Sequence, residues 1–294
     1  MHKTRAFIAG LISVLSTMAL IGFAAPGLAA AGPGAAYGQA KIVNTDRIVG
    51  FAQQTTTASN APAPSLNWAG YADTGTFSAV SANWIVPTVT CTPGVSAFST
   101  HWIGIDGNTS STVEQEGSEG DCLPNADGVI SPSYDAWFEM FGDNAVNQGF
   151  EEELSPSTNP VSPGDSISAS ISVASGVWTL TIIDSSSSHP GWTFSDSIAF
   201  AGAAQSSAEW VVERPELCTI YGGLGAQCSA APLADFGSVT FSDATATPSG
   251  GSSGPISAYS NTAIEMVGPP NVLALPGALG VGGNAFTDTW ESLQ

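Results

Sequence analysis

The stretch SISASISV at residues 166–173 alternates serine with an apolar residue at every position. A side-chain repeat of two is typical of a β-strand that has one face in a core and the other in water. After Gly176 the alternation resumes in WTLTI at residues 178–182, and it returns in SVTFS at residues 238–242. The sequence predicts an all-β fold, a sandwich of two antiparallel sheets of the concanavalin A-like or jelly-roll type, and shows no convincing helix.

The N-terminal residues 1–30 have the order of a secretory signal peptide. Lys3 and Arg5 precede an almost unbroken apolar run at residues 6–25, and small residues follow it. A membrane anchor is the alternative, because about 20 apolar residues can span a bilayer. The small-residue tail favours cleavage, so we expect a secreted protein that has no membrane attachment afterwards.

Residues 31–64 differ from the rest of the chain in composition. They are rich in Gly, Ala, Thr, Gln and Pro and show no sustained periodicity, which predicts a propeptide or a linker. Residues 65–294 have no obvious internal repeat and are predicted to form one large β domain.

The charge balance is strongly acidic. Without the signal peptide, Lys41, Arg47 and Arg214 are the only basic Lys or Arg residues against 25 Asp and Glu. Nucleic acid and anionic membranes are poor partners, because they are bound through clustered cations. Carboxylates protonate in acid, so the self-repulsion fades there. The composition favours a protein adapted to acid, and a simple contribution to solubility is the alternative.

The four cysteines form an even set without C-x-x-C spacing, as expected of disulfides in an exported protein. They are Cys91, Cys122, Cys218 and Cys228. Three pairings are open, and we expect the first with the second and the third with the fourth, because these close the shortest loops. Zinc is the rival explanation, but neither His101 nor His189 has ligand spacing from a cysteine. We expect no metal and no cofactor.

Two segments place unusual polar residues opposite an apolar face. They are HWIGID at residues 101–106 and AWFEMF at residues 136–141. In the first segment the two isoleucines lie on one face, and Trp102 and Asp106 lie on the other. In the second segment Phe138 and Met140 lie on one face, and Trp137 and Glu139 lie on the other.

Two more segments show the same division. AEWVVE at residues 208–213 puts Glu209 and Glu213 on one face, and VEQEG at residues 113–117 isolates Gln115 between two glutamates of the opposite parity. If these strands are neighbours, one face gathers tryptophans, carboxyls and a carboxamide. That combination predicts a substrate cleft rather than a core. The acidic run at residues 151–153 is expected to be a solvated edge.

These residues resemble the glutamic peptidases, or eqolisins, which are secreted acid endopeptidases. The resemblance covers nearly all of residues 66–245 and depends on six ordered segments, at residues 66–71, 80–87, 101–107, 113–117, 136–141 and 207–213. It implies a sandwich of two long antiparallel sheets. This sequence departs from the family's pattern at Glu114 and Glu116, beside the glutamine, and at residues 223–232.

The resemblance also implies the roles of the site residues. Gln115 matches the family's catalytic glutamine and Glu209 its catalytic glutamate, and Trp102, Asp106, Trp137 and Glu139 match its cleft residues. Glu209 would activate water as a general base, since a glutamate with a pKa near ~4.3 stays partly ionised in acid. Gln115 would stabilise the oxyanion through its amide hydrogens. The implied partners are protein or peptide substrates of a monomeric enzyme.

Two other functions fit a sandwich with an aromatic and acidic face. In a glycoside hydrolase, Glu139 and Glu209 could serve as the paired carboxylates, although Gln115 would then have no necessary role. In a non-catalytic carbohydrate-binding module, the tryptophans would stack on sugars. The fold alone does not choose among these functions.

Overall fold

The computed structural model describes residues 41–45, 47–48, 61–143, 145–187, 189–220 and 226–294. The predicted signal peptide, part of the predicted propeptide and residues 221–225 lie outside this set. None of the helices in the described residues is long and apolar enough to cross a membrane. The described helical turns are two 3₁₀ turns, Asn147–Gly149 and Ile256–Ala258.

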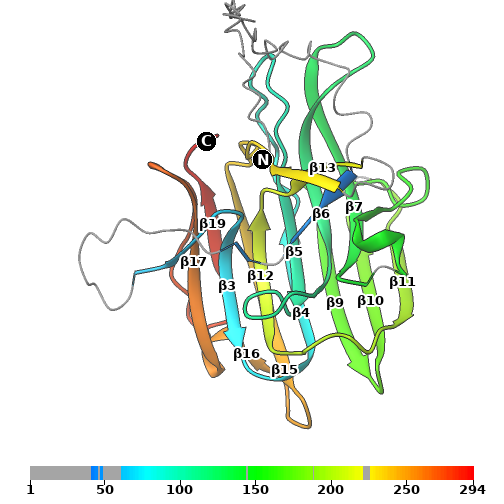
Figure 1. Ribbon diagram of the computed structural model, residues 1–294, viewed down its shortest axis with the longest axis vertical. Helices are drawn as coiled ribbons and strands as arrows, with labels where there is room; N and C mark the ends of the chain where they lie inside the picture. The colour runs from blue at the N-terminus through cyan, green and yellow to red at the C-terminus, as the bar shows by residue number, and fades with distance from the viewer. Residues whose placement is uncertain (1–40, 46, 49–60, 144, 188, 221–225) are drawn as a thin grey trace, which may run out of the picture. The chain divides into compact units, whose positions relative to one another are not determined.

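Two antiparallel sheets form the body of the domain (Figure 1). The first contains, in spatial order, β19 (Phe286–Trp290), β18 (Asn271–Pro276), β17 (Ser260–Gly268), β3 (Trp68–Thr74), β12 (Ser207–Glu213), β5 (Thr100–Ile105), β6 (Val113–Pro124), β7 (Ile130–Phe141) and β8 (Glu152–Glu153). The second contains β11 (Trp192–Ala199), β10 (Val177–Asp184), β9 (Ser166–Ala174), β4 (Phe77–Ile85) and β15 (Ser238–Pro248). The predicted all-β sandwich is confirmed.

Strand β15 belongs to both layers, because one part pairs with β4 and another with β19. Its register shifts between Ser242 and Thr245, where Asp243 has a φ of 50°. Such a bulge bends a strand and lets it pass from one sheet to the other. Short strands complete the edges: β16 (Gly254–Pro255) pairs with β15, and β2 (Ala63–Ser65) runs parallel to β17.

The alternating stretch at residues 166–182 forms most of the β9–β10 hairpin. Its loop is Ser175–Gly176, with φ angles of 53° and 75°. Two left-handed residues make the two-residue turn whose twist matches antiparallel strands. The apolar side of the hairpin, including Ile171 and Leu180, is buried between the sheets, while Ser170 and Thr181 face outward.

Six fully buried tryptophans divide between two hydrophobic clusters. Trp84, Trp178 and Trp210 belong to the core between the sheets. The other three form a separate cluster, described below. Hydrogen bonds also join the layers, since Trp210 donates to the Ser81 carbonyl at 3.0 Å. The first sheet therefore has a packed inner face and a distinct outer face.

Both expected disulfides are confirmed, Cys91–Cys122 and Cys218–Cys228. The second joins directly paired residues of β13 (Glu216–Ile220) and β14 (Ala226–Ala230). Strand β1 (Lys41–Val43) adds to the other side of β13, giving a small three-stranded sheet.

Candidate active site

Glu209, Gly104 and Gln115 stand opposite one another on the neighbouring strands β12, β5 and β6 (Figure 1). Residues paired in this way send their side chains to the same face of a sheet. Ala72 and Glu139 extend the row at its two ends. At a strand spacing of about 4.8 Å, the Cα atoms of Glu209 and Gln115 are about 10 Å apart. The glycine between them has no side chain, so only Glu209 and Gln115 send side chains from these three positions.

An aromatic cluster lines this face. Trp68, Trp102 and Trp137 pack together on the side of the sheet opposite the core, and the first two rings meet edge to face at 5.0 Å. The indole of Trp102 donates to Oε2 of Glu213 at 3.1 Å. Its other edge lies over Gly104, where an added Cβ would come within 2.8 Å of the ring. Trp102 thus lies over the glycine that separates Glu209 from Gln115.

The predicted division of side chains between the two faces is confirmed, and the face predicted to be a substrate cleft is covered in this structure. Every predicted site residue has 0% exposed surface, namely Trp102, Asp106, Gln115, Trp137, Glu139 and Glu209. A covering segment, defined here as residues 41–45, 47 and 48, lies over part of this face, where it is hydrogen-bonded to Gln115, Glu139 and Glu213. Sequence reasoning placed these residues in a propeptide or linker and did not place them on the site.

Asn44 is the residue of the covering segment that meets the predicted catalytic row. Its carbonyl oxygen accepts a hydrogen bond from Nε2 of Gln115 at 2.7 Å, and its backbone N–H donates to Oε2 of Glu139 at 2.9 Å. The side-chain amide donates from Nδ2 to Oε2 of Glu151 at 2.8 Å. The amide oxygen accepts from the Thr100 hydroxyl at 3.1 Å. A peptide carbonyl therefore lies on the carboxamide that was predicted to stabilise an oxyanion.

Thr45 is bound on the other side of the same peptide bond. Its N–H donates to Oε1 of Glu213 at 3.1 Å, and its carbonyl accepts from the Trp68 indole at 3.1 Å. Its hydroxyl accepts from Nδ2 of Asn67 at 3.2 Å. Farther along, the Arg47 N–H donates to the Gly107 carbonyl at 3.0 Å. The segment is thus held by backbone and side-chain contacts along its described length.

Asp106 has a different surrounding from the other predicted cleft residues. Its carboxylate accepts from the N–H groups of Gln205 and Ser206 at 2.6 and 2.7 Å and from the Ser110 hydroxyl at 2.9 Å. Its φ of 77° is in the left-handed region, which aspartate tolerates better than most residues. Asp106 therefore ties together the loops beside Glu209.

The carboxyls of this face are poorly solvated. Burial raises the pKa of Glu209 well above its usual range, and the neighbouring Asp106, Glu114 and Asp73 carboxyls add to the shift, while Ser207 opposes it. Burial is likewise the main cause of the raised pKa of Glu139, which the Asn44 N–H partly offsets. Neither carboxylate oxygen of Glu209 makes a hydrogen bond of ordinary geometry to the described residues. Its lone pairs are therefore free to accept a proton.

Glu114 and Glu116, the departures beside Gln115, have the opposite parity to it, and Glu114 lies beside Asp106. Burial raises the pKa of Glu114 to about 10, with the Asp106 carboxyl contributing. Glu116 is fully buried between the sheets, where Oε1 accepts from the Ser170 N–H at 2.9 Å. Burial raises the pKa of Glu116 well above its usual range, and backbone donors only partly oppose this. Both side chains are neutral in acid.

These raised pKa values predict that stability falls as pH rises. Above a pH of about 4 the unfolded chain releases protons that the folded protein keeps. The contribution of these carboxyls to the free energy of unfolding is therefore complete below that pH. It is lost as the pH rises toward the pKa values of the folded state, such as about 8 for Asp73. Each such group removes up to about 1.4 kcal/mol per pH unit across its window. Glu116→Gln keeps the acceptor for Ser170 and should reduce the slope by about that amount. Denaturant unfolding from pH 3 to 8 measures it, and equal slopes for variant and wild type would contradict the expectation.

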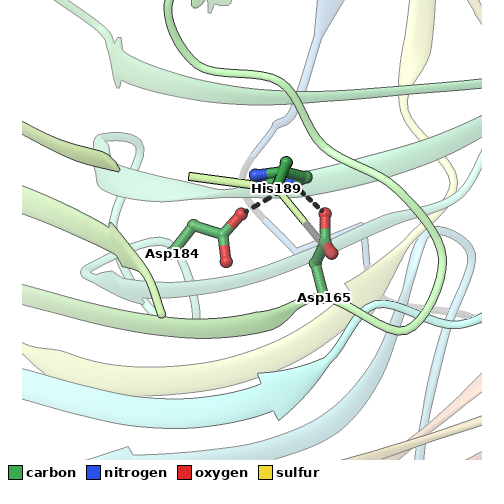
Figure 2. A group of neighbouring side chains, drawn as sticks. All are labelled: Asp165, Asp184 and His189. Atoms are coloured by element: carbon green, nitrogen blue, oxygen red, sulfur yellow. Dashed lines mark hydrogen bonds and ion pairs between the residues drawn. The ribbon is translucent and has the colours of Figure 1, made fainter. Parts of the chain in front are cut away.

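Asp165, Asp184 and His189 are one of two groups with metal-ligand chemistry among the described residues (Figure 2). Nε2 of His189 lies 2.8 Å from the carboxylate of Asp165 and 3.3 Å from that of Asp184. The hydrogen bond to Asp165 is the main cause of the raised pKa of His189. In acid the protonated His189 therefore provides the positive charge next to the carboxylates of Asp165 and Asp184. It lies at the end of the β9–β10 hairpin, on the sheet that does not carry the site.

The second group consists of Glu119, Asp135 and Glu151, beside the covering segment. Burial and the negative charge of Asp135 raise the pKa of Glu151 well above its usual range, and the bond from Asn44 opposes this. The expected solvated edge is wrong for Glu151, which is only 9% exposed, and it holds for Glu152 and Glu153, which are exposed. Glu151 is thus part of the site.

Sequence reasoning missed several residues of this site. Glu213 was assigned to the correct face but received no role, although it shares the parity of Glu209. Thr100 lies one position before the segment at residues 101–106, so it was not considered. Asn44 had no local signal at all, because its place depends on contacts with residues more than 50 positions away.

A profile of the Peptidase A4 family matches residues 66–274. The chain belongs to this family and is an endopeptidase of the glutamic class. This family membership does not support the two alternatives, a glycoside hydrolase and a carbohydrate-binding module. The match begins after the covering segment.

Two fungal peptidases are similar in sequence. Aspergillopepsin-2 of Aspergillus niger is 30% identical over 213 residues, which cover 65% of this chain and 67% of the relative. Scytalidopepsin B of Scytalidium lignicola is 31% identical over 253 residues, covering 84% of this chain and 85% of the relative.

Solved structures support the fold. Scytalido-glutamic peptidase with a transition-state analogue inhibitor superposes with a TM-score of 0.59, covering 76% of this chain and 98% of that one at 24% identity. The same values hold for a member of the eqolisin family in complex with the tripeptide Ala-Ile-His.

Proposed function

We propose that Glu209 and Gln115 act together to hydrolyse peptide bonds in acid. The observation that carries this is the 2.7 Å hydrogen bond from Nε2 of Gln115 to the Asn44 carbonyl, in the row that also contains Glu209. An oxyanion donor must lie within about 2.7 to 3.1 Å of the oxygen that becomes negative. A peptide carbonyl already occupies that place.

In the reaction, Glu209 takes a proton from a water molecule as the water attacks the carbonyl carbon. The carbonyl oxygen becomes negative and is stabilised by the side-chain amide of Gln115, which does not titrate and so works at any pH. Glu209 then gives its proton to the leaving amine as the C–N bond breaks. Trp102, Trp137, Asp106 and Glu139 line or brace the groove that holds the substrate.

The covered state is inactive for two reasons. No external chain can reach Gln115 or Glu209, which are fully buried. In addition, burial is the main cause of the raised pKa of Glu209, so this carboxyl is protonated in acid while it is covered and cannot act as a base. Release of the segment readmits water and lowers the pKa toward the usual value near ~4.3.

We assign residues 1–30 to a signal peptide and residues 31–64 to a propeptide, whose described part covers the site. The enzyme at residues 65–294 would be secreted and act as a monomer on proteins or peptides, without nucleic acid or membrane partners. The disulfides suit such an oxidising destination.

The proposal is tested by giving the full chain denatured casein and a set of polysaccharides from pH 2 to 7. We expect casein cleavage in acid only, after a delay during which intact-mass measurements show loss of the covering segment, and no sugar release. Folded protein that leaves casein intact at every pH would refute the proposed function. Full activity at time zero with the segment still attached would refute the role of the segment.

A further inference from the structure

Resting on the proposed function, we infer that the active site selects asparagine as the residue that contributes the carbonyl of the cleaved bond. The residue whose carbonyl lies on Gln115 is by definition the one on the acyl side of the bond, and in the covered state that residue is Asn44. The pocket around its side chain therefore describes a specificity subsite.

The pocket offers one acceptor and one donor, spaced for a carboxamide. Glu151 Oε2 accepts from Nδ2 of Asn44 at 2.8 Å, and the Thr100 hydroxyl donates to Oδ1 at 3.1 Å. Asn44 and Thr100 have 0% exposed surface and Glu151 has 9%. Water is thus almost excluded, so a side chain that fails to pair with these groups leaves a buried polar atom without its partner and is bound less well.

Other side chains satisfy the pocket less well. Leucine has nearly the shape of asparagine but neither donor nor acceptor. It would leave Glu151 without its donor and leave the Thr100 hydroxyl only its longer bond to the Glu213 carbonyl, at 3.4 Å. Lysine has donors and no acceptor. Burial raises the pKa of Glu151, so in acid this carboxyl is neutral and offers a cation no charge partner. A neutral carboxamide matches the donor and the acceptor together.

Two glutamates bind the backbone on either side of the Asn44 carbonyl. Glu139 accepts the N–H of Asn44, and Glu213 accepts the N–H of the following Thr45. Both bonds are to the backbone, so they bind any residue. Discrimination at this position therefore depends on Thr100 and Glu151.

The test uses the full chain after activation in acid, with casein as the measure of general activity. Octapeptides of the sequence of residues 41–48, Lys-Ile-Val-Asn-Thr-Asp-Arg-Ile, are compared with versions that carry leucine, glutamine or lysine in place of the asparagine. We expect kcat/KM for the asparagine peptide to exceed that for the leucine peptide by on the order of 100-fold, because a site built to hydrogen-bond a side chain rejects an analogue without these groups. For any peptide that binds without being cleaved, Ki replaces kcat/KM.

The matched enzyme variant is Thr100→Val, which keeps the shape and removes the donor. It should lower the asparagine-to-leucine ratio by roughly tenfold, and Glu151→Leu should lower it independently. Thermal unfolding of both variants checks that they fold. Casein cleavage combined with an asparagine-to-leucine ratio below about threefold, or a ratio unchanged in both variants, overturns this inference and leaves the proposed function standing. Failure to cleave casein overturns both.

Discussion

Replacing Glu209 by glutamine is expected to reduce kcat/KM for casein in acid by about 10³- to 10⁴-fold. The substitution keeps the size of the side chain and removes the base, and general base catalysis contributes about 10²- to 10⁴-fold. Glu209 is fully buried in the row with Gly104 and Gln115, so no other carboxyl has the same position. Steady-state kinetics at pH 3 to 4 measure the loss.

This experiment needs a control for activation, because a variant that cannot cleave peptide bonds would not release its own covering segment by self-cleavage. A recognition site for an unrelated, specific protease, placed between residues 48 and 61, allows the segment to be cut in every variant alike. Glu213→Gln is the matched comparison on the same strand and face. If Glu209→Gln retained more than about a tenth of the wild-type rate after such cutting, Glu209 would not be the base.

Replacing Gln115 by alanine is expected to lower kcat by about 10²- to 10³-fold, the loss measured for removal of one oxyanion donor. The loss should appear in kcat more than in KM, because the bond from Nε2 strengthens as the carbonyl oxygen becomes negative. Kinetics over a range of casein-derived peptide concentrations separate the two constants.

Gln115→Glu is the informative companion variant. Its side chain is a donor only when protonated, so activity should survive partly in strong acid and disappear as the new carboxyl ionises, whereas wild type keeps its donor throughout. An unchanged kcat in Gln115→Ala, or identical pH profiles for Gln115→Glu and wild type, would exclude an oxyanion role for this carboxamide.

Much of the site could be predicted from local patterns. The period of two in β5, β6, β7 and β12 separated Trp102 and Glu209 from the buried isoleucines and from Trp210, and the structure confirms each assignment. Parity is a strictly local property, because successive side chains point to opposite faces of any strand. Which strands are neighbours is not local, and the resemblance to a family supplied it.

The covering segment shows where local patterns end. Nothing in the residues around Asn44 indicates that its carbonyl meets Gln115, 71 positions away, or that its amide meets Glu151, 107 positions away. These contacts place the segment over part of the acidic face. The same face that alternation marked as a cleft is therefore a cleft filled by the protein's own chain.

Acid adaptation was predicted from the charge balance and stays a prediction, for which the buried carboxyls would be a more specific cause. Fully buried carboxyls, such as Glu116 in the core and Asp288 in β19, have pKa values raised by burial. They stabilise the fold while protonated and oppose it when ionised. A count of acidic residues cannot distinguish these buried groups from solvated ones such as Glu152.

The central claim is that Glu209 and Gln115 act as one unit on a carbonyl placed where that of Asn44 lies. Its most direct test is a double-mutant cycle in kcat/KM with Glu209→Gln, Gln115→Ala and the combined variant, all cut between residues 48 and 61. The account predicts strong non-additivity, with the double variant within about threefold of the slower single variant, as for catalytic residues that work together. If the two single substitutions act independently, their losses in kcat/KM multiply in the double variant. Such a product of the two losses would contradict the central claim.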